Sequence, residues 1–215
     1  MIGSESLKYN FSKKKFMVPD LETSCLNLAM GYNRPWQVSW LICQGTEIIK
    51  KNNYYLRWPD FYISPGAAAA TRFDPRNIEL YGQDPKEILD LFDKDLYNEE
   101  YIIVGQNLLN FDVYIHSMWR ENFGNSIDYS YIDRIIDVRA LAVCWKLGLK
   151  FKETEDFLAQ QYRFLSVRKK GLKTNLAQLC RDLGIAYNPD EMHDALVDIK
   201  KTFEVFHPLV KQLEI

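Results

Sequence analysis

The first 60 residues contain three apolar runs of strand length. The run at 16–18 (FMV) leads directly into 20–22 (DLE), and a second run covers 37–44 (QVSWLICQ). The Gly-Thr pair at 45–46 suits a hairpin turn into the long aromatic segment 48–58, whose residue types favour β-structure. This part of the chain is therefore predicted to form antiparallel strands.

From residue 84 onward, strands and helices are expected to alternate. The segment 84–87 (DPKE) has the order of a helix N-cap, a proline at the first helical position and a capping-box glutamate. The pattern then predicts a strand at 101–105, a helix from about 111, a strand at 134–138 and a helix at 140–148. A hairpin followed by this alternation indicates an α/β protein, with a mixed sheet covered by helices.

Two further helices are predicted in the last third of the chain. Thr174 is expected to cap the first helix, and Gly184 is expected to end it. The second carries apolar residues at helical spacing, and Pro208 is expected to end or bend it. The apolar positions are Leu176, Leu179 and Leu183 in the first helix and Leu196, Ile199, Phe203 and Phe206 in the second.

Composition limits the class of protein. Of the 215 residues, 47% are apolar and 26% are charged, which is typical of a globular protein and excludes a disordered chain. No apolar run approaches the ~18 residues that a membrane span needs, and the polar start does not resemble a signal peptide. We therefore expect one domain over residues 1–215, located in the cytoplasm, or in the host cytoplasm if a phage encodes it. The four cysteines lack metal-site spacing and are expected to be buried and reduced.

The charge balance restricts how the protein could bind nucleic acid. With 29 acidic and 27 basic residues the net charge is −2, and a protein that binds nucleic acid by bulk charge would be far more basic. Any such binding must therefore be local. One basic stretch either holds a phosphate backbone or is a solvated charged face, and it contains Arg163, Arg168, Lys169, Lys170 and Lys173.

Three segments far apart in the sequence place an acid where secondary structure should expose it. Asp20 and Glu22 stand at the end of the first strand, where alternate residues point to the same side. Asp112 lies between a strand and a helix, where α/β sheets carry their sites. In HDALVD, His193 opens the final helix and Asp198 follows beside its apolar stripe. Adjacent carboxylates repel each other unless one is protonated or a divalent cation lies between them.

Four carboxylates and one histidine form a donor set for Mg²⁺ or Mn²⁺ rather than for zinc. Two such ions can stabilise the entering and leaving oxygens of a phosphodiester displacement, and a histidine can take the proton from water. The pattern therefore indicates metal-dependent hydrolysis of a nucleic acid backbone. Taken singly, Asp20 and Glu22 could be a solvated strand end and His193 a surface residue, and we expect His116 and His207 to be structural.

The order DLET, GQNLLNFD and HDALVD resembles the DEDDh family of 3′-to-5′ exonucleases, which includes proofreading subunits, ribonuclease T, oligoribonuclease and phage enzymes. Each motif alone is weak, but three in this order, ending in H-x-A-x-x-D, are specific. The resemblance covers roughly residues 16–207. It implies a ribonuclease H-like fold, with a central five-stranded mixed sheet flanked by helices, and the removal of nucleoside 5′-monophosphates from a 3′ end.

The resemblance also implies a role for each motif residue. Asp20 would bridge two divalent metal ions, Glu22 and Asp198 would complete the first metal site, and Asp112 would serve the second, partly through water. His193 would be the general base.

Contacts to the substrate are implied in the same way. Leu21, Thr23 and Ser24 would meet the terminal nucleotide, mainly through backbone groups. Asn107 would support the second motif, and Phe111 would pack below it.

The sequence departs from the family pattern near the first motif. Pro19 is unusual in a central strand, so either its nitrogen faces no partner or the strand is bulged there. Cys25 stands where many relatives carry glycine, and Ser24 replaces a threonine. A further acid, Asp137, resembles a family residue that lies at a strand end near the site.

Other functions fit parts of this pattern. A 3′-to-5′ exoribonuclease would use the same metal chemistry, although single-stranded DNA is the preferred substrate here. A non-catalytic nucleic-acid-binding module would keep the fold without the reaction, and the complete set of acids argues against it. Two carboxylates that act as acid and base on a glycoside would need no metal. A polymerase or another replication protein is a candidate partner, and no membrane is expected.

Overall fold

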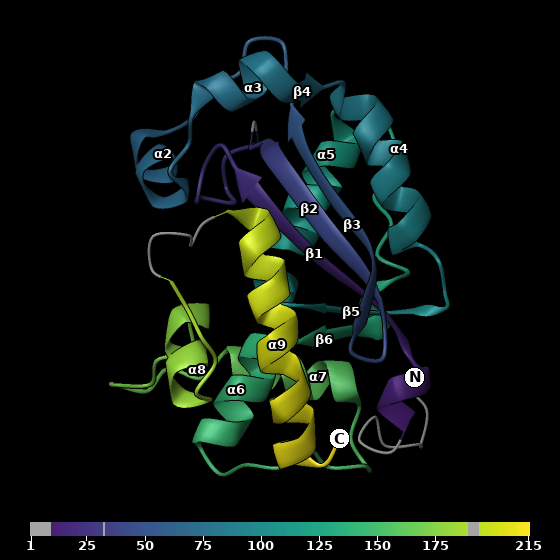
Figure 1. Cartoon of the computed structure of the whole chain (residues 1–215), viewed down its shortest axis with the longest axis vertical. Coiled ribbons are helices and arrows are strands. Elements are labelled where there is room, and N and C mark those ends of the chain that lie inside the picture. The colour runs from purple at the N-terminus through teal and green to yellow at the C-terminus, as the bar shows by residue number, and fades with distance from the viewer. Residues whose placement is uncertain (1–9, 32, 189–193) are drawn as a thin grey trace.

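The computed structural model describes residues 10–31, 33–188 and 194–215. Its strands form one sheet in the order β4-β3-β2-β1-β5-β6 (Figure 1). Pairing is antiparallel from β1 to β3 and parallel for β5 with β1, β6 with β5 and β4 with β3, which confirms the predicted mixed α/β sheet. The strands are β1 (Lys15–Thr23), β2 (Pro35–Gln44), β3 (Glu47–Leu56), β4 (Gly82–Gln83), β5 (Tyr101–Gly105) and β6 (Ile135–Asp137).

The described sheet has one strand more than the five that were expected. The additional strand, β4, consists of only Gly82 and Gln83, which pair with Tyr55 and Leu56 at the end of β3. Two residues show no periodicity, so a strand of this length cannot be recognised from the sequence pattern.

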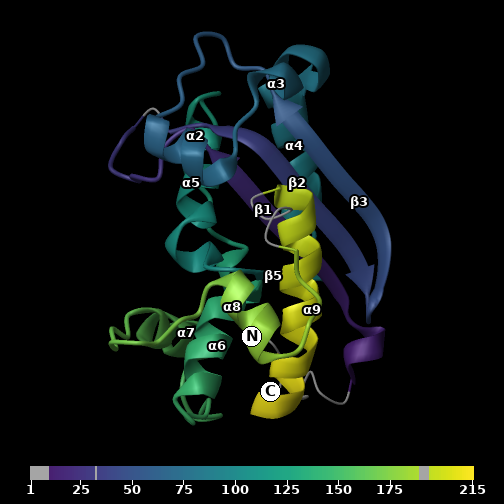
Figure 2. The same ribbon diagram turned by 60° about the vertical axis from the view of Figure 1, so that its left-hand side comes forward.

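Helices cover both faces of the sheet. The helices are α2 (Pro65–Thr71), α3 (Pro75–Tyr81), α4 (Pro85–Leu96), α5 (Asp112–Glu121), α6 (Val138–Lys146), α7 (Phe157–Leu165), α8 (Leu176–Asp182) and α9 (Ala195–Leu213), with short 3₁₀ turns at η1 (Phe11–Lys13), η2 (Leu108–Asn110) and η3 (Ile132–Arg134). Figure 1 shows α9 in front of β1 and β2, and Figure 2 shows α2 and α3 at one end of the molecule and α6, α7 and α8 at the other.

Alternate residues of β1 enter two different apolar cores. Phe16 and Val18 pack with residues of α6, α8 and α9, whereas Met17 and Leu21 pack with residues of α4 and α5. Because side chains alternate along a strand, the even-numbered residues that follow Val18 also face α9. This alternation directs the two acids of the first motif toward the final helix.

The proline at position 19 does not interrupt strand pairing. Leu21 donates its backbone N–H away from β2, toward Asp112, and the nitrogen of Pro19 lies on the same edge of β1. The pairing of β1 with β5 ends at Met17, before the proline is reached. The register irregularity of β1 lies between Glu22 and the next residue. The nitrogen of Pro19 therefore faces no strand partner, and the strand is not bulged there.

Helix ends test the capping predictions. The side chain of Asp84 accepts hydrogen bonds from the first turn of α4, as predicted, and Gly184 follows α8 with a φ of +67°. The predicted cap at Thr174 is wrong, since the side chain of Asn175 caps α8. Pro208 does not end the last helix, which continues for a further turn to Leu213.

The cysteines are free thiols within the described residues. Three of them are buried, as expected, and one is half-buried: Cys43, Cys144 and Cys180 in the first group and Cys25 in the second. In the described ranges, none of the helices combines the length and the apolarity that crossing a membrane requires.

His116 lies inside the protein on α5. Its Nε2 is 2.7 Å from Oδ1 of Asp93, and its Nδ1 is 3.0 Å from the hydroxyl of Tyr131. Arg120 pairs with the same aspartate. These contacts tie α5 to α4, as expected for a structural histidine.

Candidate active site

The four predicted metal-binding acids converge from three elements. Asp20 and Glu22 lie on β1, Asp112 is the first residue of α5, and Asp198 lies in the first turn of α9. The backbone amide of Leu21 donates a 3.1 Å hydrogen bond to Oδ1 of Asp112, which fixes the second motif against the first. Glu22 is 9% exposed and Asp112 7% exposed, while Asp20 and Asp198 are half-buried. The site is thus largely removed from solvent.

Burial and mutual repulsion dominate the electrostatics of these acids. Burial raises the pKa of Asp20 well above its ordinary value, and the charges of four neighbouring carboxylates raise it further. Burial likewise raises the pKa of Glu22 to about 8, with additional contributions from Asp198, Asp112 and Asp194. The pKa of Asp112 is raised to about 7 by burial, although the hydrogen bond from the Leu21 amide opposes the shift. The carboxylates of this cluster therefore repel one another unless a positive charge is bound among them.

The donor set fits hard divalent cations, because it consists of carboxylate oxygens alone. A cation would remove the repulsion that raises these pKa values and would let the carboxylates ionise together. As they stand, no three Asp, Glu, His or Cys side chains in the described part of the chain are grouped so that they could hold a metal ion. The carboxylates are within electrostatic reach of one another and would have to draw closer around an ion.

Asp137 holds the second motif in place. This fully buried side chain accepts hydrogen bonds from the backbone amides of Asn107, Leu109 and Arg139, at 3.0, 3.1 and 2.9 Å. Burial raises its pKa to about 6, and these backbone donors oppose the shift. Asn107 adopts a left-handed conformation with a φ of +66°, so the chain turns sharply just before Asp112. The position of Asp137 at the end of β6 agrees with the family segment that it resembles.

Gln161 is a supporting residue that the sequence did not indicate. It lies on α7, where its Oε1 accepts from the backbone amide of Asp137 at 2.7 Å and its Nε2 donates to the carbonyl of Ile135 at 2.9 Å. Its side chain is fully buried. Asn107 is held from another direction, since Arg139 donates to its Oδ1 at 2.6 Å. In the sequence Gln161 is the second residue of a Gln-Gln pair within a helical stretch, and nothing there marks its role.

Asp194 is a second residue that was missed. Its side chain accepts from the amides of Leu196 and Val197 and so caps α9, and its charge raises the pKa values of Asp20 and Glu22. An aspartate directly before a helical apolar stripe is a recognisable capping signal. His193 lies outside the described residues, and its role as general base stays a prediction.

A row of polar side chains extends from the acids across the sheet. Ser39 pairs with Asp20 and Gln37 with Glu22, and both side chains are buried. Asn53 on β3 joins them, since its Oδ1 accepts from Gln37 at 3.0 Å and from Ser39 at 2.8 Å. In the sequence Gln37 and Ser39 interrupt the apolar run at 35–43, whereas Asn53 ends the polar stretch 50–53.

Thr23 and Ser24 are buried, and their polar groups have partners inside the protein. The Thr23 hydroxyl donates to the carbonyl of Cys25 at 3.0 Å. The Ser24 hydroxyl accepts from the amide of Arg34 at 3.0 Å, its own amide donates to the Arg34 carbonyl, and its carbonyl accepts from Ser64. These bonds give both residues a structural role, and their contact with a nucleotide stays a prediction.

The other expected substrate contacts lie close to the acids. The side chain of Leu21 is buried and borders a cavity of about 20 Å³ beside Asp112, enough space for about one water molecule. Phe111 is half-buried against the same core, and Asn107 is half-buried at the entrance to the motif. The structure therefore brings these residues to the site, and their contact with substrate stays a prediction.

No protein-family model matches the sequence, and no curated protein matches it either. Solved structures do match. E. coli exonuclease I in complex with a dT13 oligonucleotide superposes with a TM-score of 0.71 and 16% identity over 93% of this chain and 42% of that one. The zinc-bound E. coli exonuclease I complex with single-stranded DNA gives 0.70 and 18% identity over 93% and 41%. Exonuclease I in complex with SSB-Ct gives 0.70 and 18% identity over 94% and 42%.

This chain has the ribonuclease H-like fold of the exonuclease I nuclease domain. The similarity inferred from the three motifs is therefore confirmed at the level of the fold. The chain spans about 42% of the length of the exonuclease I structures that it matches.

Proposed function

We propose that this chain is a single, metal-dependent exonuclease domain that removes nucleoside 5′-monophosphates from the 3′ end of single-stranded DNA. The observation that carries the proposal is the convergence of Asp20, Glu22, Asp112 and Asp198 into one largely buried cluster. A non-catalytic domain gains nothing from four carboxylates that raise one another's pKa values, since each costs stability when it ionises. The exonuclease I fold adds independent support.

The residues divide into groups that would bind metal and groups that would position them. Asp20, Glu22 and Asp198 would hold one Mg²⁺ or Mn²⁺ ion, and Asp20 with Asp112 would hold a second. Such ions stabilise the charge that develops on the oxygens of a phosphodiester as it is cleaved.

The protein itself supplies position, exclusion of water and proton transfer. The Leu21 amide fixes Asp112, and Asp137 fixes the loop that carries it, so Asp112 is held in place before substrate arrives. The burial of Glu22 and Asp112 limits the access of bulk water to these two acids. His193 would accept the proton of the attacking water as its oxygen bonds to phosphorus and the P–O3′ bond breaks. The water oxygen would stay in the released 5′-phosphate, and the 3′ oxygen of the shortened strand would take up a proton.

The test is degradation of 5′-labelled single-stranded DNA, duplex DNA and RNA with Mg²⁺, Mn²⁺ or EDTA. We expect a ladder that shortens from the 3′ end of single-stranded DNA, requires metal and disappears in Asp20→Asn. Preferential degradation of RNA would reassign the substrate to the exoribonuclease class. Binding in EDTA with no degradation in either metal would favour a non-catalytic module, and turnover of a glycoside in EDTA would replace the nuclease proposal.

A replication protein is the partner class that we propose. The exonuclease I structures include complexes with single-stranded DNA and with SSB-Ct, so this fold is found with both kinds of ligand. Co-sedimentation with purified single-stranded-DNA-binding protein or polymerase, with and without DNA, tests this for the present chain.

A further inference from the structure

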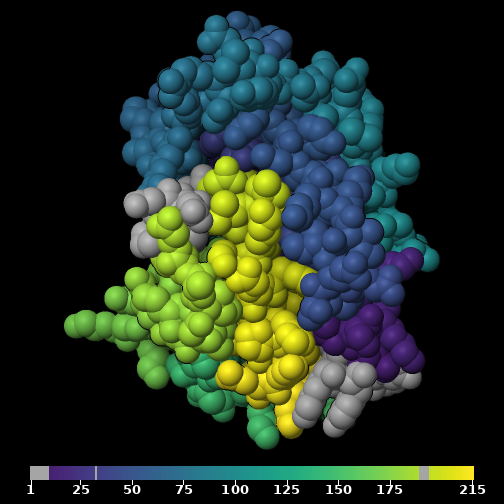
Figure 3. All heavy atoms as spheres, in the orientation of Figure 1, coloured from purple at the N-terminus to yellow at the C-terminus, as the bar shows by residue number. Residues whose placement is uncertain are grey.

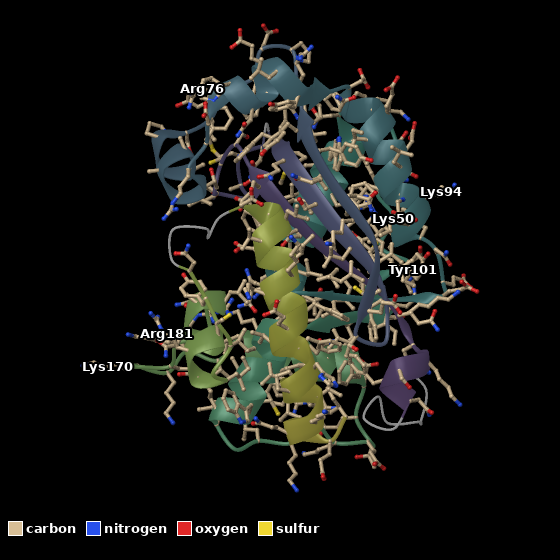
Figure 4. The ribbon with its side chains drawn as sticks, in the orientation of Figure 1. Lys50, Arg76, Lys94, Tyr101, Lys170 and Arg181 are labelled. Atoms are coloured by element: carbon tan, nitrogen blue, oxygen red, sulfur yellow. The ribbon has the colours of Figure 1, made fainter. Side chains whose placement is uncertain are left out.

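The segment between α7 and α8 is a strongly basic loop. Residues 166–175 (SVRKKGLKTN), called the basic loop below, contain four cations and no acid. All four cationic side chains are exposed: Arg168, Lys169, Lys170 and Lys173. Lys170 lies at the tip of a projection that stands out from the body of the molecule (Figures 3 and 4). The projection presents its charges to solvent on several sides.

These charges are not neutralised by nearby acids. Within the described ranges, no salt bridge involves the side chains of Lys169, Lys170 or Lys173. Arg168 donates to the backbone carbonyls of Leu165 and Val167 rather than to a carboxylate. By contrast, Arg163 at the end of α7 pairs with Glu155. The excess positive charge of the loop is therefore available to an external anion.

The loop is anchored beside the candidate active site. Gln106 donates from Nε2 to the carbonyl of Thr174 at 2.7 Å, and Gln106 directly precedes the turn at Asn107 that leads to Asp112. Within the loop, the side chain of Leu172 packs against the core. The hydrogen bond thus ties the basic loop to the same segment that carries the second motif.

Three exposed tyrosines belong to the segments that hold the second motif and to α7. Tyr114 is 41% exposed two residues after Asp112, Tyr129 is 37% exposed, and Tyr162 on α7 is 36% exposed. Tyr129 donates to Oγ of Ser117 at 3.2 Å, so α5 holds this ring in place. Burial raises the pKa of Tyr162, and the charges of Tyr114, Asp137 and Tyr129 raise it further, so these groups lie within electrostatic reach of Tyr162.

Tyr162 is also connected to the second motif through the backbone. The adjacent residue, Gln161, binds the amide of Asp137, whose carboxylate holds the amides of Asn107 and Leu109. Tyr162 and the basic loop are therefore both joined to the segment that leads to Asp112, Tyr162 through Gln161 and the loop through Gln106. Single-strand binders combine these two features, with cations that follow the phosphates and rings on which bases stack.

We propose that the basic loop and the tyrosines Tyr114, Tyr129 and Tyr162 form a track for a nucleic acid single strand upstream of its 3′-terminal nucleotide. The loop binds the phosphates, and the rings stack on the bases. This inference rests on the proposed function, since it assumes that the 3′ end occupies the carboxylate site. An acidic protein segment would satisfy the lysines but has no planar bases for the exposed rings.

Removal of charge tests the phosphate contacts. The variant Lys169→Ala/Lys170→Ala is compared with Lys50→Ala/Lys94→Ala, which removes the same charge from the opposite side of the molecule (Figure 4). Binding of a labelled DNA strand of about 16 nucleotides is measured by fluorescence anisotropy in EDTA over a range of salt concentrations. We expect the loop variant to bind about tenfold more weakly, with a salt slope reduced by about 0.7 for each lost contact. The control variant should keep the wild-type slope.

Removal of a ring tests stacking. Tyr162→Ala should weaken binding of the same strand about fivefold, whereas Tyr162→Phe keeps the ring and should bind as wild type does. In Mg²⁺ the Lys169→Ala/Lys170→Ala variant should cleave a dinucleotide at the wild-type rate, because the single phosphodiester of a dinucleotide occupies the carboxylate site and leaves no upstream phosphate for the loop. Cleavage of the longer strand should show a raised KM with little change in kcat.

The outcomes separate this inference from the proposed function. If the strand binds with the expected dependence on Lys169, Lys170 and Tyr162 but is never degraded, the track stands and the exonuclease proposal fails. The track is overturned if the loop variant keeps wild-type affinity and salt slope, or if Lys50→Ala/Lys94→Ala weakens binding equally. It is also overturned if Tyr162→Phe binds as poorly as Tyr162→Ala, since the ring then makes no contribution.

Discussion

The backbone amide of Leu21 donates a hydrogen bond of 3.1 Å to Oδ1 of Asp112, across a sequence separation of 91 residues. Leu21 lies between the two acids of the first motif, and Asp112 opens α5. The bond is buried, so leaving its donor unpaired would cost free energy. Asp112 therefore has two roles: its side chain accepts the hydrogen bond of this amide, and its negative charge would bind a cation. Substitutions that remove one role or both can distinguish them.

Asp112→Asn keeps an acceptor oxygen and removes the charge. We expect metal-dependent degradation of single-stranded DNA to fall by at least ~100-fold, because one preorganised electrostatic group is lost. The melting temperature of the metal-free protein at pH 8 should equal or exceed that of wild type, since a buried carboxylate no longer ionises among like charges.

Asp112→Ala removes the acceptor as well. It should unfold more easily than Asp112→Asn by about 1–3 kcal/mol, the cost of a buried amide without a partner. Urea denaturation of the two variants in EDTA measures this difference. Equal stabilities would show that the Leu21 bond does not hold the two motifs together.

The raised carboxyl pKa values predict how the stability of the metal-free protein depends on pH. The pKa of Glu22 rises from 4.5 to about 8 on folding and that of Asp112 from 3.8 to about 7, so the folded state binds more protons than the unfolded state. Stability is then fully present below the ordinary pKa values and is lost as pH rises through about 7 to 8, by up to ~1.4 kcal/mol per pH unit for each titrating group. Urea denaturation in EDTA between about pH 5 and pH 8 measures the slope.

Two controls accompany this measurement. Asp20→Asn removes one like charge and should flatten the loss of stability with pH. Mg²⁺ or Mn²⁺ should restore stability mainly at the alkaline end, because metal binding there displaces fewer protons. A wild-type stability that rises steadily from pH 5 to pH 8 in EDTA would contradict the proposed electrostatics of the site.

The role proposed for His193 makes a kinetic prediction. His193→Ala should lower the rate of degradation by ~10² to 10⁴, while the stabilisation of the protein by Mg²⁺ is retained. The rate as a function of pH should also lose its dependence on a group that titrates near neutrality. Full activity of this variant at neutral pH would remove His193 from the mechanism.

Much of the fold could be predicted because local signals agreed with the final packing. The Pro-Lys-Glu sequence after Asp84 marks the start of α4, and the alternation of β1 places Asp20 and Glu22 on one side of the sheet. Thr174 was a reasonable cap from the local sequence, but its carbonyl binds Gln106, and Asn175 serves as the cap. Where a contact between residues far apart in the sequence decides the conformation, the local sequence does not predict it.

The candidate active site could likewise be predicted only in part. The acids that would bind metal could be found because carboxylates in fixed motifs are a chemical signal. Gln161 could not be found, since its side chain binds the backbone of Asp137, which is 24 residues away in the sequence. The sequence does not distinguish a glutamine with such a role from any other glutamine in a helix. Pro208 was expected to end or bend the last helix, and it does not end it, because the buried Leu209 and Val210 beyond it continue α9 despite the lost hydrogen bond.

Asp137 should act as a positioning residue, and two substitutions distinguish this role from a merely structural one. Its Oδ1 accepts from Asn107 and Arg139, and its Oδ2 accepts from Leu109. Asp137→Asn keeps the first oxygen and loses the second acceptor, so we expect a folded protein with normal KM and a kcat reduced about 10- to 100-fold. Asp137→Ala leaves three amides without this acceptor and should be destabilised by several kcal/mol, at about 1–3 kcal/mol for each buried donor. If Asp137→Asn melts and turns over as wild type does, the hydrogen bond to Leu109 has no part in aligning Asp112.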